Sequence, residues 1–381
     1  MTAGWCYTRV MSEYVVVSGY YGFDNLGDEA ILEEILAEVG RLIKDKSKIV
    51  VLSQNPEKTR SVFGVSSVDR WSLSALHPVF SKAKLFISGG GGLYQDTTSV
   101  KSVVYYAGLA MLARLCGAPM VIYAQGIGPL RSALSAALTK SAMKSARAIT
   151  VRDSNSVSLL EKWGIRNVVL TADPVWCLEP TPLPESMVAA LGRVPAGRFL
   201  LGLSLRESPL ITLAMVEAFA NSLAKSAKPG TVLVPLILQH NQDAELLNAF
   251  AKVWKDHGME TLDLDFAQLT RPSQWISLLS RFDLIVGMRF HALLMALKSG
   301  VPTIGLAYDP KVSYLMKNFD QPSLNLAKGY DEEGAASQLS ELMAGALCNI
   351  LELQERATKV SASQKELACQ NFEVIAKILN S

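Results

Sequence analysis

The chain has 381 residues, of which 49% are hydrophobic and 19% are charged. This composition excludes a disordered or highly solvated protein, and the length favours two domains over one. Lys and Arg (37) nearly balance Asp and Glu (35), which gives a net charge of +2. Because nucleic-acid binding usually requires a strong basic excess or a basic stripe, we expect no nucleic-acid partner.

The five cysteines are widely spaced and match neither a disulfide framework nor a zinc motif. They are Cys6, Cys116, Cys177, Cys348 and Cys369. We interpret them as thiols of a reducing compartment. The N-terminal MTAGWCYTRVMSE lacks the apolar stretch of a secretory signal, and either Met1 or Met11 fits as the native start. The most apolar stretch, 103–128, is broken by Gly117 and Pro119 into pieces too short to span a bilayer, so we expect a cytoplasmic protein.

Short β-branched segments alternate with amphipathic segments in the first half of the chain. This alternation is typical of a parallel sheet covered by helices on both faces. The expected strands are Tyr14–Ser18, Lys48–Ser53, Lys84–Ser88, Met120–Ala124, Ala148–Val151 and Val168–Leu170. They predict an N-terminal Rossmann-like domain over residues 1–178.

Prolines then crowd a segment with weak periodicity, which we interpret as a linker over residues 179–196. The alternation restarts in a second Rossmann-like domain, residues 197–355. Its expected strands are Phe199–Ser204, Thr231–Leu238, Glu260–Leu264, Leu284–Val286 and Thr303–Leu306. The pattern is then helical to the end, with a break expected near 357–363 and a C-terminal helix, 356–381, that can pack back on the first domain. This α/β organisation predicts the glycosyltransferase-B architecture, whose active site lies in the cleft between two Rossmann-like domains.

Three glycine-rich segments follow expected strands of the first domain: 19–30, 89–96 and 123–129. Glycine lets a ligand or another chain segment approach the backbone. The spacing is not that of a dinucleotide-binding GxGxxG motif, and the carboxylates of the first segment would repel a pyrophosphate. The polar side chains suit sugar hydroxyls better. The candidates are Asp24, Asn25, Asp28, Tyr94 and Gln125, with a helix N-cap as the alternative role for Asp28.

Four basic side chains follow expected strands in both halves of the chain. Arg152 follows Ala148–Val151, and its alternative role is a surface ion pair with Asp153. Arg289 and His291 begin an apolar helix after the strand that ends near Gly287, and Lys311 follows the next strand. Such a cluster indicates a small, multiply charged anion.

Six segments occur in the order GYYGFDNLGDEA, GGGG with a following Gln-Asp, YAQGIGP, VRDS, ADP and GMRFHALLMALKSGVPTIGLAYDPK. Together they resemble the polysaccharide pyruvyl transferase family, most closely its CsaB type. The resemblance implies a glycosyltransferase-B fold and transfer of the enolpyruvyl unit of phosphoenolpyruvate to two hydroxyls of one sugar. The product is a cyclic ketal, phosphate is released, and neither a metal nor a cofactor is needed.

The same resemblance implies that Arg289, His291 and Lys311 of the second, donor-side domain hold the donor together with Arg152, which the first, acceptor-side domain contributes. Arg289 and His291 are expected to be catalytic. Family precedent suggests a lipid-linked cell-wall glycan containing N-acetylmannosamine as the acceptor. It also suggests a role in S-layer anchoring and peripheral contact with the inner face of the membrane. Two alternatives stay open: a nucleotide-sugar glycosyltransferase of the same architecture, and a non-catalytic module that binds glycan or phosphate. The sequence specifies neither the acceptor linkage nor the oligomeric state.

Overall fold

A computed structural model describes residues 13–97 and 99–380 of the chain. The chain divides into two compact units. The first unit comprises Met1–Cys177 and Glu366–Ser381, and the second comprises Leu178–Lys365. The alternative start at Met11 lies outside the described residues.

The described part of the first unit contains a seven-stranded parallel sheet in the order β3-β2-β1-β4-β5-β6-β7. Its strands are β1 Tyr14–Ser18, β2 Ile49–Ser53, β3 Ser66–Asp69, β4 Ala83–Ser88, β5 Met120–Gln125, β6 Ala148–Val151 and β7 Val168–Leu170. Val16 pairs with Val50 on one side and with Phe86 on the other, so β1 lies in the buried centre. The strand order reverses between β1 and β4, the position at which open α/β sheets bind ligands beyond their carboxyl ends.

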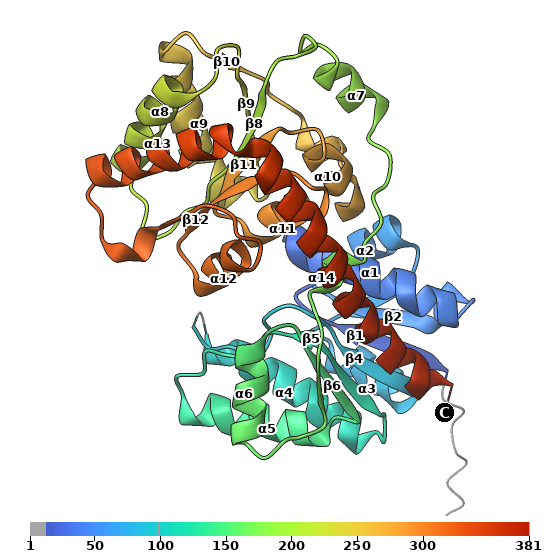
Figure 1. Cartoon of the computed structure of the whole chain (residues 1–381). Helices are drawn as coiled ribbons and strands as arrows, with labels where there is room; N and C mark the ends of the chain where they lie inside the picture. Colours follow the sequence, from blue (N-terminus) through green and yellow to red (C-terminus); the bar gives the residue numbers. More distant parts are fainter. Residues whose placement is uncertain (1–12, 98, 381) are drawn as a thin grey trace, which may run out of the picture. The chain divides into compact units, whose positions relative to one another are not determined.

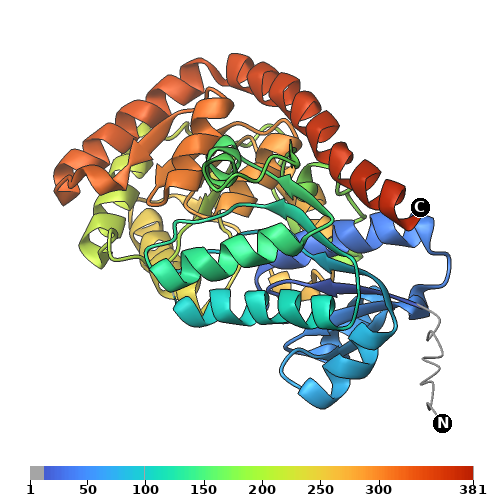
Figure 2. The ribbon, with the colours of Figure 1, turned by 90° about the horizontal axis from the view of Figure 1, so that it is seen from below.

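Helices cover both faces of the first sheet (Figure 1). They are α1 Leu26–Leu42, α2 Pro56–Phe63, α3 Leu73–Ser81, α4 Val100–Leu115, α5 Ala133–Ser145 and α6 Ser154–Lys162, with the 3-10 turns η1 Lys46–Lys48 and η2 Pro174–Trp176. Right-handed crossovers from β1 to β3 put α1 and α2 on one face, and the return through α3 puts the later helices on the other. Figure 2 shows α4 and α5 side by side, and the core beneath them includes Phe80, Tyr106 and Met143.

The second unit repeats this plan, with six parallel strands among its described residues in the order β10-β9-β8-β11-β12-β13. They are β8 Leu200–Ser204, β9 Val232–Pro235, β10 Glu260–Thr261, β11 Leu284–Gly287, β12 Thr303–Ala307 and β13 Ser323–Asn325. The helices are α7 Glu185–Leu191, α8 Leu213–Ser226, α9 His240–Asp256, α10 Pro272–Leu279, α11 Phe290–Lys298, α12 Pro310–Asn318 and α13 Glu332–Cys348, with η3 Phe266–Gln268 and η4 Leu326–Lys328. Phe219, Phe250 and Trp254 lie in its core.

The segment expected as a linker, 179–196, belongs to the second unit and contains α7. The start of this segment is hydrogen-bonded to α10: the Ser277 hydroxyl donates to the Thr181 carbonyl at 2.6 Å. The Thr181 and Ser273 hydroxyls are 2.8 Å apart.

Helix α14, Ile350–Leu379, is continuous, so the break expected near 357–363 is wrong. Two serines in this stretch make hydrogen bonds that leave the helix intact. Ser363 Oγ donates to the Val360 carbonyl at 2.8 Å, and Ser361 Oγ donates to the Lys298 carbonyl at 3.3 Å. In the described part of the chain, no helix combines the length and apolarity that a membrane span needs.

Candidate functional site

The Asp28 carboxylate and the Arg152 guanidinium lie against neighbouring glycines at the carboxyl edge of the first sheet. A methyl group built on Gly91 would lie 3.1 Å from Asp28 Oδ1, and one built on Gly126 would lie 3.1 Å from Arg152 Nε. The two glycines are joined directly, because the Gly126 N–H donates to the Gly91 carbonyl at 2.8 Å. Gly91 has φ +104°, which an L-residue rarely adopts. The strand ends therefore bring a carboxylate and a guanidinium to one glycine-lined edge of the sheet.

A carboxylate from the next strand end holds Arg152. Its Nη1 pairs with Asp173 Oδ2 at 2.5 Å, and the Asp173 side chain is almost fully buried. Asp153, the partner considered from the sequence, instead caps α6 by accepting from the Ser156 N–H at 2.8 Å. Arg152 is thus a positioned, largely buried cation and not one half of a loose surface pair.

The turn after β1 gives its polar residues different roles. Asn25 is the N-cap of α1 and accepts from the Gly27 N–H at 3.1 Å, so the N-cap role considered for Asp28 is wrong. Asp24 is exposed and pairs with Lys58 Nζ at 2.6 Å. Asp28 lies in the first turn of α1, where the helix dipole favours a negative charge.

Glu29 is an acidic residue that the sequence reasoning missed. Its Oε1 accepts from the Gly22 N–H at 2.7 Å. Burial raises the pKa of Glu29 to about 7, although the Gly22 hydrogen bond opposes this shift. Carboxyl groups with a pKa near neutrality are frequent among acid–base catalysts. Its adjacency to Asp28 within the glycine-rich segment was the available sequence signal.

Tyr94 and Gln125 are fully buried and support the second glycine-rich segment. The Tyr94 hydroxyl lies 3.3 Å from Ser88 Oγ, and burial raises the pKa of Tyr94 to about 12. Gln125 Oε1 accepts from the Leu93 N–H at 3.2 Å, and its Nε2 donates to the Gly89 carbonyl. Both side chains therefore hold the loop and do not face solvent.

The buried Tyr21 side chain explains why two positions in these segments are glycine. A methyl group built on Gly89 would lie 2.2 Å from the Tyr21 hydroxyl oxygen, and one built on Gly19 would lie 2.2 Å from Tyr21 Cζ. Glycine at these positions leaves room for this ring. These two glycines therefore require no ligand.

In the second unit, the N-terminal turn of α9 holds Arg289. Arg289 Nε donates to Asp243 Oδ1 at 3.2 Å, and its Nη2 contacts the same oxygen. Asp243 is fully buried, and its other oxygen accepts from the Gln239 N–H at 2.9 Å. Arg289 is itself the N-cap residue of α11. Its guanidinium is therefore fixed at the carboxyl edge of the second sheet.

Arg206, which follows β8, is a second cation at this edge that the sequence reasoning missed. Its Nη2 donates to Gln242 Oε1 at 3.1 Å, and Arg289 Nη2 donates to the same oxygen at 3.2 Å. Its Nη1 donates to the Tyr308 hydroxyl, beyond β12, at 3.1 Å. An arginine within two residues of a strand end was the signal that identified Arg152, and the same signal was present here.

His291 and Lys311 begin the helices that follow β11 and β12. His291 is half-buried in the first turn of α11, with its ring edge-on to Phe290 at 5.1 Å. Lys311 is exposed in the first turn of α12, with its Nζ 3.6 Å from Asp309 Oδ2. Strands β11 and β12 are neighbours, so Arg289, His291 and Lys311 follow adjacent strand ends. Among the residues that the structure describes, no group of three His, Cys, Asp or Glu side chains is arranged to hold a metal ion.

Comparison with solved structures defines the class of fold. HepE of Anabaena, in complex with UDP, is 12% identical, with a TM-score of 0.60 over 96% of this chain and 99% of that chain. MnaA of S. aureus, also with UDP, is 9% identical, with a TM-score of 0.60 over 93% and 92% of the two chains. A glycosyltransferase of Rickettsia africae is 11% identical, with a TM-score of 0.54 over 97% and 96%. These similarities confirm the predicted fold of two Rossmann-like domains of the glycosyltransferase-B class.

The family model of polysaccharide pyruvyl transferases matches residues 25–310. The chain therefore belongs to the polysaccharide pyruvyl transferase family, as its motifs indicated. None of the curated proteins compared with the chain matches it.

Proposed function

We propose that the protein transfers the pyruvyl group of phosphoenolpyruvate to two hydroxyls of one sugar in a glycan, forming a cyclic ketal and releasing phosphate. Family membership supports the transferase class. The observation that carries the proposal is the pair of guanidiniums, Arg206 and Arg289, that share the Gln242 amide oxygen at 3.1 and 3.2 Å.

Phosphoenolpyruvate matches this pair in charge and in shape. It carries a carboxylate and a nearly dianionic phosphate, and guanidinium groups bind both through paired N–H donors. Two positive groups held close together repel each other, and Asp243 compensates only part of their charge. A multiply charged anion removes that repulsion. Lys311 and the N-termini of α11 and α12 add favourable potential for the phosphate.

The reaction balances without an oxidant or a reductant. Protonation of the methylene carbon gives a methyl group and leaves C2 as an oxocarbenium ion, to which the first sugar hydroxyl adds. The C2–O bond to phosphate then breaks, and the second hydroxyl closes the ketal. One hydroxyl proton ends on the methyl carbon and the other leaves with phosphate. In this scheme Arg206, Arg289 and Lys311 stabilise the departing phosphate.

We assign the acid–base roles to polar groups that follow strands β1 and β11 along the chain. His291 is our candidate for protonating the methylene carbon, a step worth about 10²–10⁴ in rate. Asp28 and Glu29 are candidates for deprotonating acceptor hydroxyls, with Asp24 and Asn25 beside them. Arg152 is proposed as a further donor-binding residue, and Tyr94 and Gln125 support the acceptor side through the loop that they hold.

The finer assignment follows the CsaB type. In this proposal the acceptor is N-acetylmannosamine of a lipid-linked cell-wall precursor, and the product serves S-layer anchoring. The protein then works in the cytoplasm, in peripheral contact with the inner face of the membrane. It needs neither a metal nor a cofactor for the chemistry.

The test incubates the protein with phosphoenolpyruvate and candidate glycosyl lipids and measures phosphate release together with the mass of the glycan. We expect phosphate and the mass increase of a pyruvate ketal to appear together. Lys311→Ala should weaken both, whereas the matched control Lys317→Ala, in the last turn of the same helix, should not.

Two other results would each overturn the proposal. Thermal protection by a nucleoside diphosphate but not by phosphoenolpyruvate would indicate a nucleotide-sugar glycosyltransferase. Binding of phosphoenolpyruvate without turnover on any glycan of the panel would indicate a non-catalytic module.

A further inference from the structure

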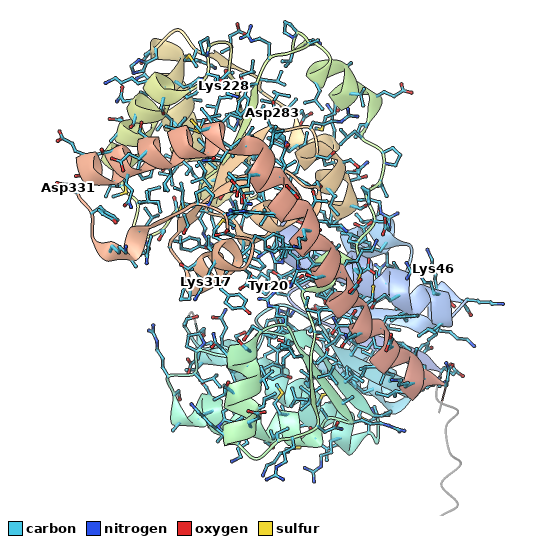
Figure 3. All side chains as sticks on the ribbon, in the orientation of Figure 1. Tyr20, Lys46, Lys228, Asp283, Lys317 and Asp331 are labelled. Atoms are coloured by element: carbon cyan, nitrogen blue, oxygen red, sulfur yellow. The ribbon has the colours of Figure 1, made fainter. Side chains whose placement is uncertain are left out.

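Three aromatic rings lie beyond the carboxyl ends of β1 and β3 in the first unit. Tyr20, labelled in Figure 3, stacks on Phe23 with ring centroids 4.0 Å apart and planes 4° apart. Tyr20 is 42% exposed, and Trp71, directly after Arg70, is 57% exposed. We call Tyr20, Phe23 and Trp71 the aromatic platform. Exposure of two large rings at the carboxyl edge of the sheet needs an explanation, because burial of such rings is strongly favourable.

Arg70 joins the rings of the platform into one rigid unit. Its guanidinium carbon lies 5.1 Å from the Phe23 ring centroid and 5.3 Å from that of Trp71. The guanidinium donates to the Gly19 carbonyl at 3.0 Å and to the Tyr106 hydroxyl at 3.2 Å. Arg70 is only 3% exposed, and its Nε has no hydrogen-bond partner among the described residues. The cation–π contacts therefore hold the rings around a buried charge.

The Trp71 indole is also fixed in orientation. Its Nε1–H donates to Gln54 Oε1 at 2.9 Å, and its ring packs on Tyr105 at 4.7 Å. A large ring that is already ordered loses little conformational entropy when a ligand packs on it.

Polar groups surround the platform. Asp24 follows Phe23 along the turn and forms an exposed ion pair with Lys58 of α2, and the Gln54 side-chain amide oxygen accepts from the indole N–H. Burial, and then the negative charge of Asp28, raises the pKa of the Tyr20 hydroxyl, which therefore stays protonated and can donate a hydrogen bond. Apolar faces interleaved with donors and acceptors match a pyranose ring, which has C–H faces and a rim of hydroxyls.

We propose that the aromatic platform binds the acceptor glycan, with sugar rings packed on Trp71 and on Tyr20. This inference rests on the proposed function and assigns its acceptor subsite. A protein partner fits less well, because stable protein interfaces bury about 800 Å² on each side and two exposed rings supply far less.

The test compares Trp71→Ala and Tyr20→Ala with the wild-type chain. The probe is a soluble N-acetylmannosaminyl-N-acetylglucosamine disaccharide with a short alkyl aglycone, observed by saturation-transfer difference NMR. Each variant should weaken the disaccharide signal and raise the KM for this acceptor about tenfold, as the loss of one well-packed ring does, while the KM for phosphoenolpyruvate stays unchanged. Trp71→Phe, which keeps an aromatic face, should restore part of the binding.

Leu115→Ala is the matched control, because Leu115 is 77% exposed at the end of α4 that leads into β5 and so lies at the opposite edge of the sheet. It should change neither binding nor KM. An unchanged acceptor KM and disaccharide signal in both platform variants would overturn the platform and leave the proposed function intact. Conversely, a disaccharide signal that depends on Trp71, in a protein that never releases phosphate, would support the platform and overturn the proposed function.

Discussion

The Sγ atoms of Cys177 and Cys369 lie 3.1 Å apart, although 192 positions separate the two residues. Cys177 is buried at the end of the first segment of the first unit, and Cys369 is exposed on α14. Burial raises the pKa of the Cys177 thiol, so it is a poor nucleophile at neutral pH. The two sulfur atoms are therefore close enough for a disulfide to form, although the Cys177 thiol reacts slowly at neutral pH.

We predict that a thiol oxidant such as diamide joins Cys177 and Cys369 in a disulfide and raises the Tm of the first unit. The bond would close a long loop, for which stabilisation is typically about 2–4 kcal/mol. Peptide mapping under non-reducing conditions measures the bond. Cys369→Ser should abolish it, and Cys348→Ser, at another exposed cysteine, should not. Diamide-treated protein without the cross-linked peptide would contradict the prediction.

Asn371 should be essential for docking the end of α14 in the first unit. Its Oδ1 accepts from Thr150 Oγ1 at 2.6 Å and from Thr171 Oγ1 at 2.9 Å, and its Nδ2 donates to the Ala172 carbonyl at 3.1 Å. Asn371→Ala leaves these buried groups unsatisfied, at about 1–3 kcal/mol for a group that loses its partner. Urea denaturation should show that loss for Asn371→Ala and little change for Glu366→Ala, an exposed position on the same helix segment.

Arg289 and Arg206 should each be required for phosphate release. Replacement of either by Ala should lower kcat/KM for phosphoenolpyruvate by about 10²–10³, the effect of removing one preorganised donor to a developing charge. Arg289→Ala also leaves the buried Asp243 carboxylate without its cation, so a loss of stability of about 3–5 kcal/mol is expected.

Arg289→Lys separates these two effects, because it keeps a charge beside Asp243 but not the fork that binds an anion. It should remain folded and still be slow. Arg356→Ala, at a partly exposed arginine of α14, is the control. Activity in Arg289→Lys or Arg206→Ala close to that of the wild type would reject the donor site.

Stability should fall as the pH rises from about 5 to 8. Burial raises the pKa of Glu38 from 4.5 to about 8, against the hydrogen bond from Tyr123, and the charge of Glu34 adds to the shift. The folded state therefore binds a proton in this window that the unfolded state has released, which makes the native state less stable with each pH unit. The full effect is on the order of a few kcal/mol.

Glu38→Gln removes this titration and keeps an acceptor for the Tyr123 hydroxyl. Its Tm should decline less than that of the wild type between pH 5 and 8. Parallel curves for the two proteins would contradict the prediction. Burial also raises the pKa of Glu29, to about 7, so Glu29→Gln should remove a further part of the decline.

Much of the fold could be predicted from the sequence, because buried parallel strands are short apolar runs. Tyr14–Ser18, Ala148–Val151 and Val168–Leu170 have the expected bounds in the structure. Strands β3 (Ser66–Asp69) and β13 (Ser323–Asn325) were missed. Each is short and largely polar at the edge of its sheet, so its sequence carries no apolar run.

The site was less predictable, because its partners come from distant segments. The position of Arg289 shortly after a strand was enough to predict it as a site residue. Its partners Asp243 and Gln242 could not be predicted, because they lie at the start of α9, far away in the sequence. A glycine that makes space for a ligand looks the same in the sequence as one that makes space for a side chain. Gly89 is of the second kind, because it leaves room for Tyr21. Trp71 and Tyr20 are exposed because of how the rings pack around Arg70. The sequence alone does not predict this packing.

Helix α14 ends in the first unit, which is therefore assembled from two segments that lie far apart in the sequence. During synthesis, Asn371 can reach Thr150 and Thr171 only after the whole of the second unit has been translated. The unit that is translated first is thus the last to be completed, and a nascent chain stalled before residue 366 would expose the surface that α14 covers.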